Sequence, residues 1–138
     1  MTTTTRTTTA VRSAPLWRTG GLAGIAAALA TTAVALVSMG AGVSLEIDGA
    51  PIPLVGFAEL TLACTAIGVA LAKALGHWAA TPKRTFIAVT VALTALSTVP
   101  DLVVTATTAT RAVLITTHVV AAAIVIPLLA GRLPARTR

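Results

Sequence analysis

Four long apolar segments are the feature that most constrains how this chain can fold. They cover about residues 20–43, 54–75, 85–104 and 110–130. A helix needs about 20 apolar residues to cross the roughly 30 Å hydrocarbon layer of a membrane, and each segment reaches that length. The connections between them are too short for a soluble domain. The sequence therefore predicts an all-α, polytopic membrane protein, in which residues 17–133 form a bundle of four transmembrane helices.

The composition agrees with a membrane protein and excludes several soluble classes. Only 10% of the 138 residues are charged and 56% are hydrophobic, whereas an ordinary soluble domain carries about 25% charged residues. Too few charges remain to cover the outside of a soluble enzyme. The net charge of +6 comes from basic residues that flank apolar segments, so we expect no nucleic-acid partner. The single cysteine excludes an intrachain disulfide.

The ends of the chain differ from its middle, and the basic residues predict its orientation. Residues 1–16 are rich in threonine, basic and free of acids, which predicts a disordered N-terminal arm, and residues 134–138 form a basic tail. Nine of the ten basic residues lie on the side of the two termini, and Arg111 alone lies on the other. Because cytoplasmic segments carry the excess of Lys and Arg, we expect both termini in the cytoplasm and the bundle in the cell membrane.

Small residues recur at helical spacing on the first two segments, which favours close packing of helices in a membrane. The first segment carries Gly20, Gly24, Ala28, Thr32 and Gly40, and the second carries Gly56, Cys64, Gly68, Ala72 and Gly76. Two interpretations remain open. The stripes form an interface between these two helices, or they form the face of a homodimer.

The loop at 43–54 is the most patterned stretch outside the apolar segments. Leu45 and Ile47 alternate with Glu46 and Asp48, and the pair Asp48-Gly49 is a strong turn signal. We therefore expect a short hairpin-like flap over the outer end of the bundle. Glu46 and Asp48 are its candidate functional residues, although an ordinary amphipathic connector would carry the same pattern.

Four ionisable residues fall in the outer half of the predicted bundle: Glu59, Asp101, Arg111 and His118. A charged group there is costly unless it faces the bundle interior, a partner or water. Two interpretations remain open. In the structural one, Asp101 pairs with Arg111 and Glu59 pairs with His118, while in the functional one all four line an outward-facing polar pocket. No pair of His or Cys ligands accompanies them, so we expect no metal and no other cofactor.

Several short motifs are similar to those of a known family. They are Glu46-Ile47-Asp48-Gly49-Ala50-Pro51-Ile52-Pro53, Gly56-Phe57-Ala58, Arg84-Thr85-Phe86, the stretch from Ala92 to Leu102, Ala109-Thr110-Arg111 and Thr117-His118. On these motifs the chain resembles, from Gly20 to Leu133, a family of short four-helix membrane proteins of high-GC Gram-positive bacteria, catalogued as a domain of unknown function. The resemblance implies four helices and no particular activity.

The expected function is that of a non-enzymatic membrane protein whose outer polar cluster binds a lipid or a small lipophilic molecule. One alternative is an intramembrane acid–base enzyme, isomerase-like or cyclase-like, in which Glu59 or Asp101 donates a proton and His118 accepts one. The scarcity of aromatic residues counts against carbocation chemistry in such an enzyme. The other alternative is a small proton-coupled exporter that uses a membrane glutamate.

Overall fold

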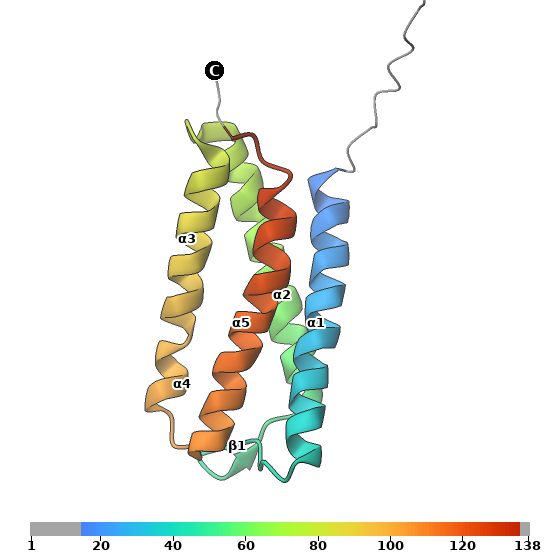
Figure 1. Ribbon diagram of the computed structural model, residues 1–138, viewed down its shortest axis with the longest axis vertical. Coiled ribbons are helices and arrows are strands. Elements are labelled where there is room, and N and C mark those ends of the chain that lie inside the picture. Colours follow the sequence, from blue (N-terminus) through green and yellow to red (C-terminus); the bar gives the residue numbers. More distant parts are fainter. Residues whose placement is uncertain (1–14, 136–138) are drawn as a thin grey trace, which may run out of the picture.

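The computed structural model describes residues 15–135, which form a bundle of four apolar membrane-length helices (Figure 1). The helical elements are α1 (Leu16–Gly40), α2 (Leu54–Trp78), α3 (Pro82–Ser97), α4 (Val99–Val103) and α5 (Thr108–Ala130). Elements α3 and α4 together make one span, and all four spans are long and apolar enough to cross a membrane. The chain is therefore an all-α, multi-pass integral membrane protein, as predicted. Its two described ends lie at one end of the bundle, opposite a small β-hairpin (Figure 1).

The helices extend beyond several of the predicted apolar segments. Helix α1 begins at Leu16 rather than at 20, α2 ends at Trp78 rather than at 75, and α3 begins at Pro82 rather than at 85. The apolar pattern measures only the hydrocarbon layer, whereas a helix continues into the headgroup layers, which bring a bilayer to about 40–45 Å. The predicted N-terminal arm thus loses Leu16 to α1, and residues 1–14 and 136–138 lie outside the described part of the chain.

A break at Thr98 separates α3 from α4. Pro100 follows at the second position of α4, and a proline inside a helix removes one hydrogen bond and clashes with the carbonyl four residues earlier. The Thr98 N–H bonds instead to the Ala95 carbonyl, at 3.3 Å, in a tighter turn. The chain then resumes as α4, which lies against α5.

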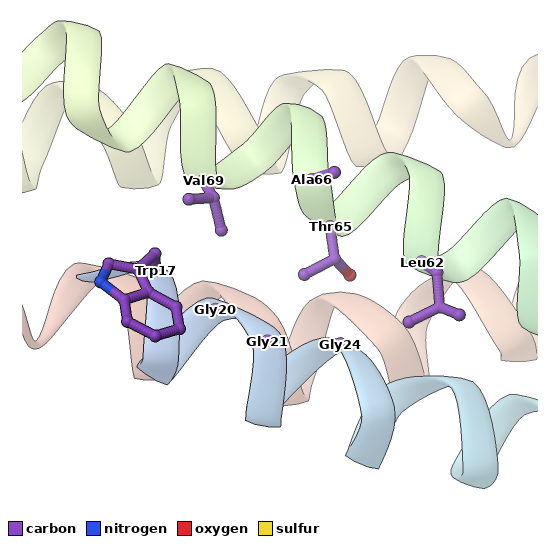
Figure 2. Close-up of a pocket in the computed structure, with 8 residues that line it drawn as sticks. All are labelled: Trp17, Gly20, Gly21, Gly24, Leu62, Thr65, Ala66 and Val69. Atoms are coloured by element: carbon purple, nitrogen blue, oxygen red, sulfur yellow. The ribbon is translucent and has the colours of Figure 1, made fainter. Parts of the chain in front are cut away.

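Helix α1 is the centre of the packing. One third (33%) of its apolar window is buried, compared with 6% for the span made by α3 and α4, and it lies against both α2 and α5. A Cβ atom on Gly20 would overlap Val69 Cγ2, and one on Gly24 would lie 3.1 Å from Thr65 Cγ2. Figure 2 shows these residues facing each other across the contact of α1 with α2. Glycine therefore sets how closely the two helices approach.

The small residues of α2 do not all face α1. A Cβ on Gly68 would meet Leu129 Cδ1 at 3.7 Å, and one on Gly76 would meet Leu133 Cδ2 at 3.4 Å, so these two face the region of α5 and its end. Cys64 is exposed. The predicted interface between the first two helices is thus confirmed for Gly20 and Gly24 and is wrong for Gly68 and Gly76, because α2 packs against α5 as well.

The predicted hairpin closes the other end of the bundle. Strands β1 (Glu46–Ile47) and β2 (Ala50–Pro51) pair antiparallel, and the turn residues Asp48 and Gly49 have φ angles of 52° and 78°, as the favoured two-residue hairpin turn requires. Leu45 is buried with Ala35, Phe57 and Leu114 in a small core beneath it. The Asp48 N–H also bonds to the Thr105 carbonyl at 2.9 Å, which ties the hairpin to the loop between α4 and α5.

Replacing Gly20 with alanine should destabilise the bundle, because the new Cβ would overlap Val69, whose branched side chain has one preferred rotamer in a helix. Overpacking of this kind costs about 1–3 kcal/mol. Gly21→Ala is the matched control, since nothing lies within 4 Å of its Cβ position. Thermal unfolding in detergent should show a lower Tm for Gly20→Ala only, with rescue by Val69→Ala. Equal Tm values for the two alanine variants would contradict this packing.

Candidate functional site

Asp101 and His118 meet where α4 lies against α5. The break before α4 sets the position of Asp101, and His118 lies ten positions after Thr108, the first residue of α5. His118 Nδ1 is 3.2 Å from Asp101 Oδ2. The same nitrogen is 2.9 Å from the Leu114 carbonyl, one turn earlier in α5. The contact therefore joins a carboxyl group and an imidazole from two separate membrane-spanning segments.

The surroundings of His118 Nδ1 fix which imidazole nitrogen carries the proton. The Leu114 carbonyl is an acceptor only, so Nδ1 must donate to it. The N–H points at that carbonyl, and Asp101 Oδ2 is consequently buried at ion-pair distance without a hydrogen bond of its own. In a neutral imidazole the other nitrogen, Nε2, then holds a free lone pair.

Arg111 lies on the same side of α5, seven residues before His118. One of its terminal nitrogens, Nη2, donates to the Val104 carbonyl at 2.8 Å, at the end of α4. Its Nε is buried and has no partner in the described residues. Arg111 therefore joins the same contact between α4 and α5. Asp101, Arg111 and His118 are called the α4–α5 cluster below.

The α4–α5 cluster leaves three polar atoms accessible. Asp101 Oδ1, Arg111 Nη1 and His118 Nε2 have no hydrogen-bond partner within residues 15–135, and none of them is among the buried atoms that lack one. The His118 side chain is 35% exposed and that of Asp101 is 14% exposed. Two acceptors and one donor are thus open to a molecule that approaches from outside the bundle.

The polar stripe that leads along α3 to Asp101 does not enlarge this cluster. The hydroxyls of Thr90, Thr94 and Thr98 each donate to a carbonyl of their own helix, at 2.7, 2.8 and 2.8 Å. Their hydroxyl hydrogens are therefore already bonded, and the stripe offers no free hydroxyl donor to the cluster.

Glu59 is not part of this cluster. It is exposed on α2, and within the described residues the one side-chain contact at ion-pair distance joins His118 to Asp101. The predicted pairs Glu59 with His118 and Asp101 with Arg111 are thus wrong. Phe57 is buried two positions earlier, and two helical positions are about 200° apart, so Glu59 lies on the opposite face. The sequence pattern groups these residues by their expected depth in the membrane, and depth says nothing about the face of a helix.

The outer loop and two hollows elsewhere on the protein bring fewer ionisable side chains together than the cluster does. Glu46 and Asp48 are both exposed on the hairpin, and Glu46 borders a shallow hollow of about 330 Å³. A second hollow, of about 280 Å³, lies between α1 and α2 beside Trp17 and Gly21 (Figure 2). None of its lining residues is ionisable. Among the described residues no group of three His, Cys, Asp or Glu side chains is placed to hold a metal ion.

Two backbone carbonyls that the sequence analysis missed accept hydrogen bonds from side chains of this cluster. The Leu114 carbonyl accepts from His118, and the Val104 carbonyl accepts from Arg111. The first has a sequence signal, because a histidine in a helix lies directly above the carbonyl four residues earlier. The second has none, since it depends on where α4 ends.

The fold defines a four-helix, multi-pass membrane protein, and the α4–α5 cluster places three ionisable residues between two of its helical elements. The chain belongs to a family of unknown function, DUF6069, whose model matches residues 11–135. No curated protein and no solved structure matches the chain.

We predict energetic coupling between Asp101 and His118 but none between Glu59 and His118. A double-mutant cycle of Asp101→Asn and His118→Gln should give an interaction energy of about 0.5–3 kcal/mol, since residues in contact are not additive. The matched cycle of Glu59→Gln and His118→Gln should be additive within about 0.5 kcal/mol. Unfolding in detergent measures both cycles. Additivity in the first cycle would contradict the observed contact.

Proposed function

We propose that the α4–α5 cluster binds the polar end of a lipid or of another lipophilic molecule. The supporting observation is the set of three accessible polar atoms without partners, Asp101 Oδ1, Arg111 Nη1 and His118 Nε2. Such groups are costly next to hydrocarbon unless their hydrogen bonds are met. A headgroup would meet them while its tail stayed in the membrane. The protein is then a binding protein rather than an enzyme.

The hairpin closes one end of the bundle, which supports entry of the ligand from the side, out of the surrounding lipid. The hairpin lies over the outer end, where Leu45 is buried and Asp48 is bonded to Thr105. The imidazole of His118 is about one third exposed, and the span made by α3 and α4 is the least buried of the four. A ligand reaches the cluster from the surrounding lipid without any opening of the hairpin.

An intramembrane acid–base enzyme is the second candidate, and one observation favours it. A carboxylate 3.2 Å from Nδ1, with Nε2 left accessible, brings together the two groups of a histidine general base, although Nδ1 here donates to the Leu114 carbonyl rather than to Asp101. The two candidates differ in the fate of the ligand, which a binding protein returns chemically unchanged. For an exporter based on Glu59, the exposed position of that residue away from the cluster provides no support.

We further propose that the chain lies in the plasma membrane with both termini in the cytoplasm. Arg18, Lys83, Arg84 and Arg132 are exposed near the end that holds the described termini, and Arg111 lies near the hairpin end. This asymmetry matches the excess of Lys and Arg in cytoplasmic segments. The α4–α5 cluster would then face the outer half of the membrane.

Cysteine labelling tests this orientation. In a Cys64→Ala background, Glu46→Cys on the hairpin should react with a membrane-impermeant maleimide in intact cells. Ala80→Cys, in the exposed loop between α2 and α3, should react only after permeabilisation. Both variants leave the basic residues in place, so neither alters the charge asymmetry itself. Labelling of Ala80→Cys in intact cells would reverse the proposed orientation.

Native mass spectrometry of the detergent-solubilised protein tests the binding function. The unmodified chain should retain a lipid-sized adduct, and the double variant Asp101→Asn, His118→Leu should lose most of it. Glu59→Gln is the matched control, because it removes an outer-half carboxylate outside the cluster and should retain the adduct. Equal retention by the double variant and the control would refute the proposal. Recovery of a chemically altered ligand would favour the enzyme.

A further inference from the structure

We infer that the α4–α5 cluster selects a neutral, hydroxyl-bearing lipophile, such as a long-chain alcohol or a diacylglycerol, over an anionic lipid. This inference rests on the proposed binding function and specifies its ligand. It follows from which atoms of the cluster remain open and from the sum of the charges around them.

The open atoms call for a ligand that both donates and accepts. While the imidazole is neutral, His118 Nε2 carries a lone pair, because Nδ1 holds the proton that bonds to Leu114. Asp101 Oδ1 is a second acceptor, and Arg111 Nη1 is a donor. A hydroxyl group donates to one of the acceptors and accepts from the guanidinium. A carboxylate or a phosphodiester has no proton to donate, so its oxygens would face the lone pairs of His118 and Asp101.

The charge of the cluster also favours a neutral ligand. The Arg111 guanidinium and the Asp101 carboxylate cancel, and the imidazole adds no charge while it is neutral. A third charge at this depth would have no counter-ion, because within the described residues no other ionisable side chain contacts the three. An anionic headgroup would add such a charge next to Asp101, and a cationic one would add it next to Arg111. A neutral headgroup leaves the balance intact.

The surface beside the cluster suits a hydrocarbon tail. Thr90, Thr94 and Thr98 lie on the half-buried side of α3 with their hydroxyl hydrogens bonded to their own helix. No free donor therefore lies along the path from Asp101 toward the middle of the membrane on this face. A tail that follows α3 keeps the headgroup at the cluster.

Three photoactivatable probes with the same 16-carbon chain and a diazirine test the inference: hexadecanol, hexadecanoate and the phosphodiester hexadecyl methyl phosphate. In detergent at pH 7, hexadecanol should label the unmodified protein about fivefold more than either anion, which is the change that one net hydrogen bond makes to an affinity. The labelled peptides should come from α3 to α5. Stronger labelling by an anionic probe at these peptides would overturn the inference while leaving the binding function standing.

Charge variants sharpen the test. Asp101→Asn leaves the cluster with one net positive charge and should shift the preference toward the anionic probes. Glu59→Gln removes the same charge outside the cluster and should leave the preference unchanged. An equal shift in both variants would overturn the inference, because it would reflect the overall charge of the protein. Labelling of the unmodified protein spread evenly over all helices, for all three probes, would instead refute the binding function, and this outcome needs no variant to fold.

Discussion

Every polar group inside the hydrocarbon layer must find its partner within the chain or in a ligand, and this constraint organises the whole structure. Several threonine hydroxyls meet it by bonding to carbonyls of their own helix, as Thr94 does to Thr90 at 2.8 Å, whereas the hydroxyls of Thr19 and Thr32 on α1 are buried without a partner in the described residues. His118 and Arg111 meet it in part, through the carbonyls of Leu114 and Val104. The α4–α5 cluster brings together three ionisable residues whose polar atoms find only some of their partners within the described residues.

The packing of the helices explains why the polar site lies on one side of the bundle. Because lipid tails are as apolar as the side chains, helices in a membrane associate through close van der Waals contact. Gly20 and Gly24 provide that contact between α1 and α2, and α1 lies against α5 as well. The span of α3 and α4 is left at the edge, with 6% of its apolar window buried. A site on the least buried span is open to the surrounding lipid.

The sequence predicted the spans and the hairpin, but not the pairing of the polar residues. Length and apolarity define a span, and Asp48-Gly49 defines a two-residue turn, so both follow from local residues. The face of each helix does not follow, because positions toward lipid and positions toward the core are equally apolar in these segments. Glu59 and Asp101 therefore carried the same signal, and only the structure separates the exposed carboxylate from the one that contacts His118. The partner carbonyl of Arg111 depended on the end of α4, which local pattern does not define.

The proline in the third span accounts for most of the geometry of the site. Pro100 ends α3 early and leaves α4 as a single short turn that carries Asp101. A helix end leaves its last carbonyls without partners and gives that end a partial negative charge, which favours a cation. Arg111 takes this position by donating to the Val104 carbonyl. Pro100 thus sets the position of the Asp101 carboxylate. It also shortens the helix that ends just before Val104, whose carbonyl accepts the hydrogen bond from the Arg111 guanidinium. The near-neutral cluster that results is what allows these ionisable groups to remain within a membrane-spanning segment.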